Sequence, residues 1–222
     1  MVSMRILQGT SVIEAPSDWR ESVLAAGRSV VMDVGTGDGR WPYEQARRDP
    51  AALYVGLDPD AAAMAEYAYR SARKPARGGV DNVVYVVAAL ESLPDELVGI
   101  ATAVRVNFPW AGLLRAVILP EAEALAALRR LLAPGATLEI VFTYDAGHDQ
   151  AALAGEDAPS LDERYVEAVL LPAYAAAGLP VQAYETLSRD EALAIASTWG
   201  RRLLHGRQRT VLRLQALRAE DA

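Results

Sequence analysis

The chain has 222 residues, of which 52% are apolar and 23% are charged, and its formal net charge is −7. This composition is typical of a globular protein with a packed core, and the lack of cysteine excludes disulfides, thiolate metal sites and a cysteine nucleophile. The sequence has only two histidines and no apolar run long enough to span a membrane. We expect a cytoplasmic monomer that holds no metal.

Charge is distributed unevenly along the chain. Residues 70–77 carry four cations and no acid, and residues 199–218 carry six arginines and no acid. The remaining 12 cations share the rest of the chain with all 29 acids, which predicts one basic face on an acidic body. The alternative is that both runs are ordinary solvated surfaces.

The N-terminal segment predicts a β-hairpin within residues 1–15. Residues 5–8 and 11–14 are the two short strands, and the turn lies at Gly9-Thr10. A helix over 17–26 is expected to follow, because Ser17 can cap its first turn and Gly27 can end it.

Five short runs rich in β-branched residues come next, with helical patterns between them. Runs without strict alternation are typical of strands buried on both faces, which favours a parallel, doubly wound sheet. The expected strands are 29–34, 53–57, 83–87, 102–107 and 137–143.

The C-terminal part begins with residues 145–162, whose Ala, Gly, Asp and Pro content predicts a mobile insertion. A helix over 164–177 is expected next, followed by strands at 181–187 and 208–214 joined by a helix near 190–199 and a loop. We therefore expect a single domain over residues 1–222, built as an α/β Rossmann-like fold with a mostly parallel seven-stranded sheet.

The most specific motif is DVGTGDG at residues 33–39, which follows the first of the five strands and precedes a helical pattern. Glycines there permit a tight turn and let the backbone approach a ligand. Asp58 ends the next strand, where a carboxylate can bind both hydroxyls of a ribose. The loop reads G-x-G-x-G with a leading acid, which resembles motif I of class I S-adenosylmethionine-dependent methyltransferases more than the dinucleotide fingerprint. The alternative is a set of turn glycines with a capping Asp.

In that class, the loop after the third strand reaches the adenine of the cofactor, which makes Ala89 and Glu91 candidates. Glu91 could equally be an acid favoured at a helix N-terminus. The candidate cofactor-binding residues are Asp33, Gly35, Gly37, Gly39, Asp58, Ala89, Glu91 and Asn107.

The fourth strand ends in Asn107-Phe-Pro-Trp110, at the sheet edge where ligands bind in open α/β folds. Near the C-terminus, Trp199 stands directly beside Arg201 and Arg202, an arrangement suited to base stacking and phosphate binding. The alternative for Trp110 is a ring that closes the top of the core.

Together, DVGTGDG, the acid after the second strand, KPARGG at 74–79, FPW at 108–110 and S-x-W-x-R-R-L followed by G-R-x-R resemble the aminoglycoside-resistance methyltransferases. That family modifies N1 of an adenine in the decoding site of 16S rRNA, using S-adenosylmethionine on the 30S subunit. The resemblance covers nearly the whole chain.

The resemblance implies that Trp110 and Trp199 sandwich a flipped adenine, that Phe108 shapes the pocket and that Ser197 belongs to the same site. It also implies an rRNA-binding set of basic residues: Arg70, Arg73, Lys74, Arg77, Arg201, Arg202, Arg207 and Arg209.

Three departures from the family pattern stand out. Asn107 replaces an apolar residue, Ala111-Gly112 lacks a hydroxyl, and the 145–162 insertion is acidic. The alternative functions are a tRNA guanine-N7 methyltransferase, which shares the fold and a similar Phe-Pro segment, and a small-molecule N- or O-methyltransferase. A non-enzymatic cofactor-binding regulator has no feature in its favour.

Overall fold

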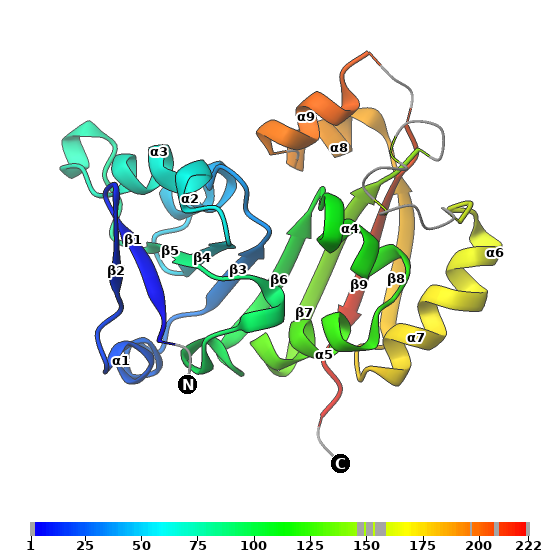
Figure 1. The fold of residues 1–222 in the computed structure, drawn as a ribbon, viewed down its shortest axis with the longest axis horizontal. Coiled ribbons are helices and arrows are strands. Elements are labelled where there is room, and N and C mark those ends of the chain that lie inside the picture. The colour runs from blue at the N-terminus through cyan, green and yellow to red at the C-terminus, as the bar shows by residue number, and fades with distance from the viewer. Residues whose placement is uncertain are drawn as a thin grey trace.

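The computed structural model describes residues 3–145, 149, 153, 159–195, 197–206 and 209–220. Within this part of the chain, one sheet has the strand order β2-β1-β5-β4-β3-β6-β7-β9-β8 (Figure 1). The strands are β1 (Arg5–Gln8), β2 (Ser11–Glu14), β3 (Val30–Val34), β4 (Leu53–Asp58), β5 (Val83–Val87), β6 (Ala101–Asn107), β7 (Leu132–Thr143), β8 (Val181–Leu187) and β9 (Val211–Leu217).

The sheet has nine strands where the sequence predicts seven, because the N-terminal hairpin is not separate from it. Strand β1 pairs antiparallel with β5, with Ile6 opposite Val86 and Leu7 opposite Tyr85, so the hairpin extends the sheet edge. Strands β5, β4, β3, β6 and β7 are parallel, and β9 runs antiparallel between β7 and β8. The prediction of a mostly parallel core is confirmed.

The helices are α1 (Trp19–Ala26), α2 (Arg40–Arg48), α3 (Ala61–Ser71), α4 (Ala111–Ile118), α5 (Ala122–Leu131), α6 (Glu163–Tyr165), α7 (Leu171–Ala176), α8 (Arg189–Ile195) and α9 (Thr198–Leu204). Short 3-10 turns occupy Pro75–Arg77, Leu90–Ser92 and Asp95–Leu97, and a π-helical turn, Val166–Leu170, joins α6 to α7. Among these described elements, none is a helix long and apolar enough to cross a membrane.

Strand β4 shows how the two faces of the sheet are filled. Leu53, Val55 and Leu57 belong to the main core, which also holds residues of α4, α5 and the 163–176 helical segment. Tyr54 points to the opposite face and packs near Ala46 of α2. Alternate side chains of a strand face opposite sides of a sheet, so β4 is buried on both faces, as expected for a parallel central strand.

Four predicted boundaries are corrected by the structure. Strand β7 (Leu132–Thr143) starts five residues before the predicted 137–143. Helix α1 starts at Trp19, two residues later than predicted, with Asp18 instead of Ser17 at the N-cap and no side-chain capping bond from Asp18. The last strand is β9 (Val211–Leu217), three residues beyond the predicted 208–214. The helix expected near 190–199 is two helices, α8 and α9, because Ser197 caps a new helix that starts at Thr198.

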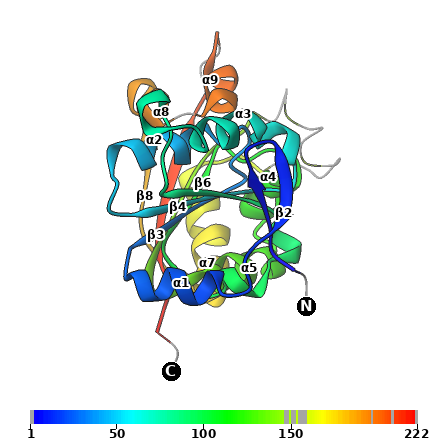
Figure 2. The same cartoon turned by 90° about the vertical axis from the view of Figure 1, so that its left-hand side faces the viewer.

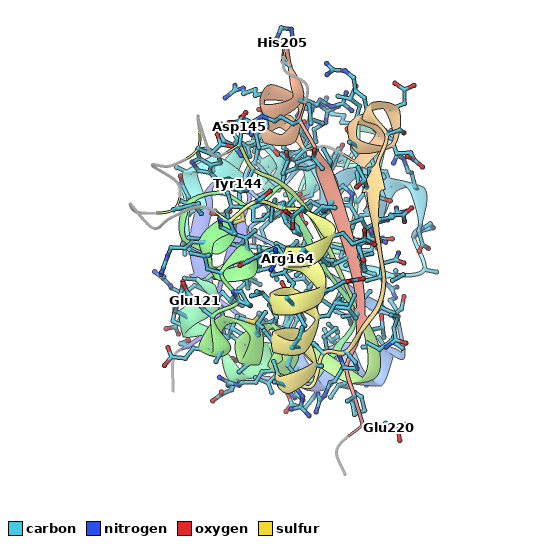
Figure 3. All side chains as sticks on the ribbon, turned by 90° about the vertical axis from the view of Figure 1, so that its right-hand side faces the viewer. Glu121, Tyr144, Asp145, Arg164, His205 and Glu220 are labelled. Carbon is cyan, nitrogen blue, oxygen red and sulfur yellow. The ribbon has the colours of Figure 1, made fainter. Side chains whose placement is uncertain are left out.

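Four helices gather at one end of the sheet. Both views place α2, α3, α8 and α9 there, while α1 and α5 lie at the other end (Figures 1 and 2). This end holds the carboxyl ends of the parallel strands. The side-chain view shows Tyr144 and Asp145 after β7, and His205 after α9, toward the same end, far from Glu220 (Figure 3).

Candidate active site

A cavity of about 870 Å³ opens at the carboxyl ends of the parallel strands. It lies where the chain order reverses, between β3 and β6, which is the position at which open α/β sheets bind ligands. Its wall includes Gly35, Gly37, Asp58, Ala89, Glu91, Asn107, Phe108, Trp110, Ser197, Trp199 and Arg202. The structure therefore brings together eleven predicted residues from five separate segments of the chain.

The glycine loop after β3 needs glycine for two measurable reasons. Gly35 and Gly39 have φ angles of +72° and +74°, in the left-handed region that side chains disfavour. A Cβ on Gly39 would also lie 2.4 Å from the Tyr85 ring, whose hydroxyl donates to the Gly39 carbonyl. Gly39 caps α2 and does not line the cavity, so its position supports the loop's shape and not the predicted ligand contact.

Asp58 ends β4 and is oriented by the backbone around it. Its Oδ2 accepts from the Gly37 N–H at 2.9 Å, and its Oδ1 accepts from the Asp60 N–H at 2.9 Å. Burial raises the pKa of this carboxyl, while the two N–H donors lower it. A carboxylate fixed in this way at the cavity wall can accept hydrogen bonds from the hydroxyls of a ligand.

Asp33 lies behind the cavity wall and is only 2% exposed. Its Oδ2 accepts from the Thr36 hydroxyl at 2.6 Å, and its Oδ1 accepts from the Asn107 amide at 3.1 Å. Burial raises the pKa of Asp33 to about 7, against the lowering effect of these two donors. Asp33 is thus a buried carboxyl poised to titrate near neutral pH.

Ala89 and Glu91 lie at the turn after β5, where Ala89 precedes the 3-10 turn Leu90–Ser92. Both line the cavity, and the side chain of Glu91 is exposed. Glu66 of α3 also lines the cavity, and no motif in the sequence had pointed to it.

Trp110 and Trp199 meet at the other end of the cavity. Their ring centroids are 5.0 Å apart with an interplanar angle of 68°, and the rings are 36% and 37% exposed. They come from the loop before α4 and the first turn of α9, which are 89 residues apart in sequence. The alternative that Trp110 closes the core is not what the structure shows, because its ring is partly exposed beside that of Trp199.

Phe108 lines the cavity but is largely buried behind it. It is 2% exposed and packs with Val141, Leu187, Leu203 and other residues beneath α8 and α9. Its φ of +50° is unusual for a residue other than glycine, as is the +49° of Ala111. Phe108 therefore shapes the pocket by anchoring the α8–α9 segment, while the turn that it begins carries Trp110 to the cavity.

Ser197 acts on the backbone of α9. Its Oγ accepts from the Gly200 N–H at 3.1 Å, which is an N-cap. This cap starts the helix at Thr198 and so fixes the place of Trp199 in the first turn.

The basic residues fall into two groups by their surroundings. Arg73, Lys74, Arg77, Arg201 and Arg202 are exposed, and no ion pair within the described residues involves them. Arg70, in contrast, pairs with Glu66 at 2.6 Å and lies over the Tyr67 ring at 5.0 Å. The charge of Arg70 is therefore partly neutralised by Glu66 within the protein.

Arg209 is a correction to the predicted RNA-binding set. Its side chain is 2% exposed and makes two hydrogen bonds to Asp149, whose side chain is 4% exposed. The pair joins the segment after β7 to the segment before β9, so this acid of the insertion neutralises a buried guanidinium. Arg207, and residues 146–148, 150–152 and 154–158 of the predicted insertion, lie outside the described residues.

Sequence reasoning missed Thr36, Tyr85 and Asp149. The hydroxyl of Thr36 stands inside the glycine motif and could have been singled out as a donor. Tyr85 looks like any aromatic in a buried strand, and nothing in the sequence connects Asp149 to Arg209, 60 residues later. The described residues contain no group of three His, Cys, Asp or Glu side chains that could hold a metal.

A methyl donor and a planar acceptor require one cavity with a nucleotide end and an aromatic end, and this cavity has both. The fold and the site place the chain in the class of Rossmann-like methyltransferases. Within that class, the chain belongs to a family described as "NpmA: 16S rRNA (adenine(1408)-N(1))-methyltransferase", whose model matches residues 5–218.

Individual relatives agree with this assignment. A 16S rRNA (adenine(1408)-N(1))-methyltransferase from Escherichia coli is 32% identical over 212 residues, which is 95% of this chain and 97% of the relative. A crystal structure of the enzyme of the same name from Catenulisporales acidiphilia, a Trp-to-Ala mutant with cosubstrate SAM, has a TM-score of 0.90 and 37% identity and covers 98% of both chains. A tRNA (guanine-N(7)-)-methyltransferase from Christiangramia forsetii matches only 36% of this chain, at 27% identity, which disfavours that alternative.

Proposed function

We propose that this protein transfers a methyl group from S-adenosylmethionine to N1 of a flipped adenine in the decoding site of 16S rRNA. It acts as a single chain on the assembled 30S subunit in the cytoplasm, and the modification confers aminoglycoside resistance. The observation that carries the proposal is that one cavity joins the Asp58 carboxylate to the Trp110–Trp199 pair.

The residues present fit the cofactor. Asp58 and the glycine loop receive the ribose, Ala89 and Glu91 lie where the adenine binds, and Asp33 with Asn107 lies nearest the methionine end. The cofactor supplies an electrophilic methyl on a sulfonium, and no other activation of the methyl group is required.

The chemistry requires orientation more than acid–base groups. At neutral pH, N1 of adenine carries an unprotonated lone pair, so it attacks without a general base. The new bond is N–C, the bond that breaks is C–S, and its electron pair stays on sulfur. The protein's contribution is to hold the three atoms in line, which can lower the barrier by several kcal/mol.

The tryptophan pair must open before a base can enter. A base stacked on both sides needs rings about 7 Å apart, since each contact between carbon layers is about 3.5 Å. The observed centroid separation is 5.0 Å and the interplanar angle is 68°, so the two rings contact each other and leave no space for a base between them. Base extrusion costs a few kcal/mol, and two stacking contacts of about 1–3 kcal/mol each offset it.

Docking is assigned to the exposed cations at the same end of the molecule. Arg73, Lys74 and Arg77 follow α3, and Arg201 and Arg202 lie on α9, and both helices are at the end of the sheet that carries the cavity (Figure 2). Arg202 itself lines the cavity. Guanidinium groups without internal partners are available for phosphate oxygens. Arg70 contributes less to docking in this proposal, because Glu66 already binds it, and a role for Arg209 would require its pair with Asp149 to rearrange.

The test is methyl transfer from tritiated S-adenosylmethionine to 30S subunits, to tRNA and to a metabolite pool in parallel. We expect label in 16S rRNA only, with reverse transcription stopping at one adenine of the decoding site, because N1-methylation blocks its pairing edge. The Trp199→Ala variant is the control for contaminating activity. Label in tRNA guanine or in a small molecule would overturn the proposal.

A further inference from the structure

The loop between α3 and β5 is folded into a fixed shape by its own backbone. Within residues 73–79, the Lys74 carbonyl accepts from the Arg77 N–H at 2.7 Å and from the Gly79 N–H at 3.2 Å. The chain passes so close to itself that a Cβ on Gly79 would lie 1.6 Å from the Arg73 carbonyl oxygen. No side chain fits there, which explains the second glycine of the KPARGG motif.

A side chain of α2 ties this loop to the body of the protein. The Tyr43 hydroxyl donates to the Gly78 carbonyl at 2.7 Å, across 35 residues of sequence. Gly78 has a φ of +88°, and a Cβ on it would lie 2.9 Å from the same hydroxyl. Glycine at this position therefore permits both the turn and the close approach of Tyr43.

Tyr43 is itself held in place by its surroundings. It is 7% exposed, and its ring packs against Tyr67 of α3 with 5.4 Å between the ring centroids. Its backbone N–H donates to the Gly39 carbonyl at 3.5 Å, and that carbonyl also accepts from the Tyr85 hydroxyl at 2.9 Å. Because Gly39 is the N-cap of α2, about one helical turn connects the glycine loop to the residue that holds the 73–79 loop.

The 73–79 loop presents cations on an ordered backbone. Arg73, Lys74 and Arg77 are exposed, whereas Tyr43 is buried and does not line the cavity. A loop that is already ordered loses less conformational entropy when it binds phosphates than a loop that becomes ordered on contact. The Tyr43 hydroxyl can therefore affect docking without contacting the cofactor or the substrate.

We propose that Tyr43 is a positioning residue for substrate docking, whose hydroxyl holds the 73–79 loop so that its three cations meet the phosphates of the RNA in a fixed arrangement. This inference rests on the proposed function and adds to it a residue that acts only through the loop. The first turn of α2 then sets the position of these cations relative to the cofactor cavity.

Tyr43→Phe is the direct test, because it keeps the ring and removes only the hydroxyl. We expect 30S binding to weaken about three- to tenfold, as the loss of one hydrogen bond predicts, with a raised KM for 30S subunits and an unchanged kcat. The affinity for S-adenosylhomocysteine, measured by calorimetry, should stay at the wild-type value. Tyr184→Phe removes a hydroxyl of β8 that donates to Glu167, and this control should match wild type in all these measurements.

A double-mutant cycle shows whether the hydroxyl acts through the loop. Arg77→Ala should weaken 30S binding by a smaller factor in the Tyr43→Phe protein than in wild type, because the loosened loop no longer holds Arg77 in place. Arg201→Ala, on α9, should weaken binding by the same factor in both proteins. Equal factors for Arg77→Ala in the two proteins would overturn the proposal. Wild-type 30S affinity for Tyr43→Phe, or a matching loss of S-adenosylhomocysteine affinity, would overturn it as well.

Trypsin gives an independent readout that needs no ribosome. Cleavage after Arg77 requires the loop to open, because its backbone is held by hydrogen bonds. We expect Tyr43→Phe to be cut there several-fold faster than wild type, while cleavage after Arg28, in the exposed loop before β3, keeps its rate. Equal rates after Arg77 would contradict the holding role of the hydroxyl. If cleavage is accelerated but wild type does not bind 30S subunits, the proposed function fails and the attachment of the loop by Tyr43 stands.

Discussion

At the scale of single residues, the site is built on side chains that are already oriented before a ligand arrives. Asp58 accepts from two backbone N–H groups, one in the glycine loop and one at the start of α3. These bonds remove the rotational freedom of the carboxylate, so a ligand does not have to order it. Preorganisation of this kind raises affinity without adding contacts.

Asp58→Ala should weaken S-adenosylmethionine binding at least tenfold, because it removes up to two charge-assisted hydrogen bonds of about 1.5–3 kcal/mol each. Calorimetry measures the change. Asp60→Ala is the matched control, since Asp60 is an equally charged neighbour that caps α3 and does not line the cavity. Asp60→Ala should lower Tm and leave cofactor affinity intact. Equal affinity for Asp58→Ala and wild type would contradict the ribose assignment.

Trp110→Ala and Trp199→Ala should each lower the rate of 30S methylation more than tenfold, while 30S binding stays within a few fold of wild type. A base held on one face can tilt out of line, and phosphate contacts dominate docking. Single-turnover assays and filter binding separate the two quantities. Trp→Phe variants should be milder, because a smaller ring remains.

Because both tryptophans are partly exposed, these substitutions should change activity without unfolding the protein. Each ring is more than a third exposed, so truncation should cost far less than the 3–5 kcal/mol typical of a core aromatic. A folded Trp199→Ala protein with full methylation activity would contradict the stacking of the target base between the two rings. An unfolded Trp110→Ala protein would mean that Trp110 stabilises the core.

The sequence was most informative at positions where a structural or chemical role requires one particular residue type. The glycines at positive φ and the acid at the end of β4 follow from motif and strand order. The pairing of the two tryptophans was implied by the family resemblance. The packing of Phe108 beneath α8 and α9 was not predicted, because a sequence cannot tell an aromatic that only lines a cavity from one that also anchors the helices behind it. The Asp33–Asn107 bond was also out of reach, since it depends on the register between β3 and β6.

At the scale of elements, the α8–α9 segment carries Trp199 and is fastened at two points. Phe108 and its neighbours bury the underside, and the Arg209–Asp149 pair fixes the chain between α9 and β9 to the segment after β7. The sequence predicted one helix here because 190–199 has no strong break. The Ser197 cap that divides it becomes evident only from the backbone geometry.

Breaking the buried pair should destabilise the protein strongly. Asp149→Ala or Arg209→Ala leaves a buried charge without its partner, which typically costs about 3–5 kcal/mol. Chemical denaturation measures this loss. The Asp149→Leu/Arg209→Leu double variant should cost less than the sum of the single changes, because neither charge remains. Glu185→Ala, at an exposed pair with Arg213, should change stability by less than about 1 kcal/mol. A similarly small effect for Asp149→Ala would show that the pair does not hold the segment.

At the scale of the whole molecule, the proposed function requires a protein with a net charge of −7 to bind rRNA, which is itself a polyanion. Five exposed cations of the predicted RNA-binding set, Arg73, Lys74, Arg77, Arg201 and Arg202, belong to segments at the end of the sheet that carries the cavity. We therefore expect docking to depend on orientation, with these cations facing the phosphates of the proposed substrate.

Salt dependence tests this arrangement. Arg73→Ala and Arg77→Ala should each weaken 30S binding and reduce the slope of log K against log salt concentration by about one, because each loses one phosphate contact. Cofactor affinity should be unaffected, since neither side chain lines the cavity. Arg28→Ala removes an equal charge from the exposed loop before β3, at the far end of the sheet, and should leave the slope unchanged. If Arg28→Ala and Arg73→Ala change the slope equally, binding follows total charge and the molecule has no basic docking face.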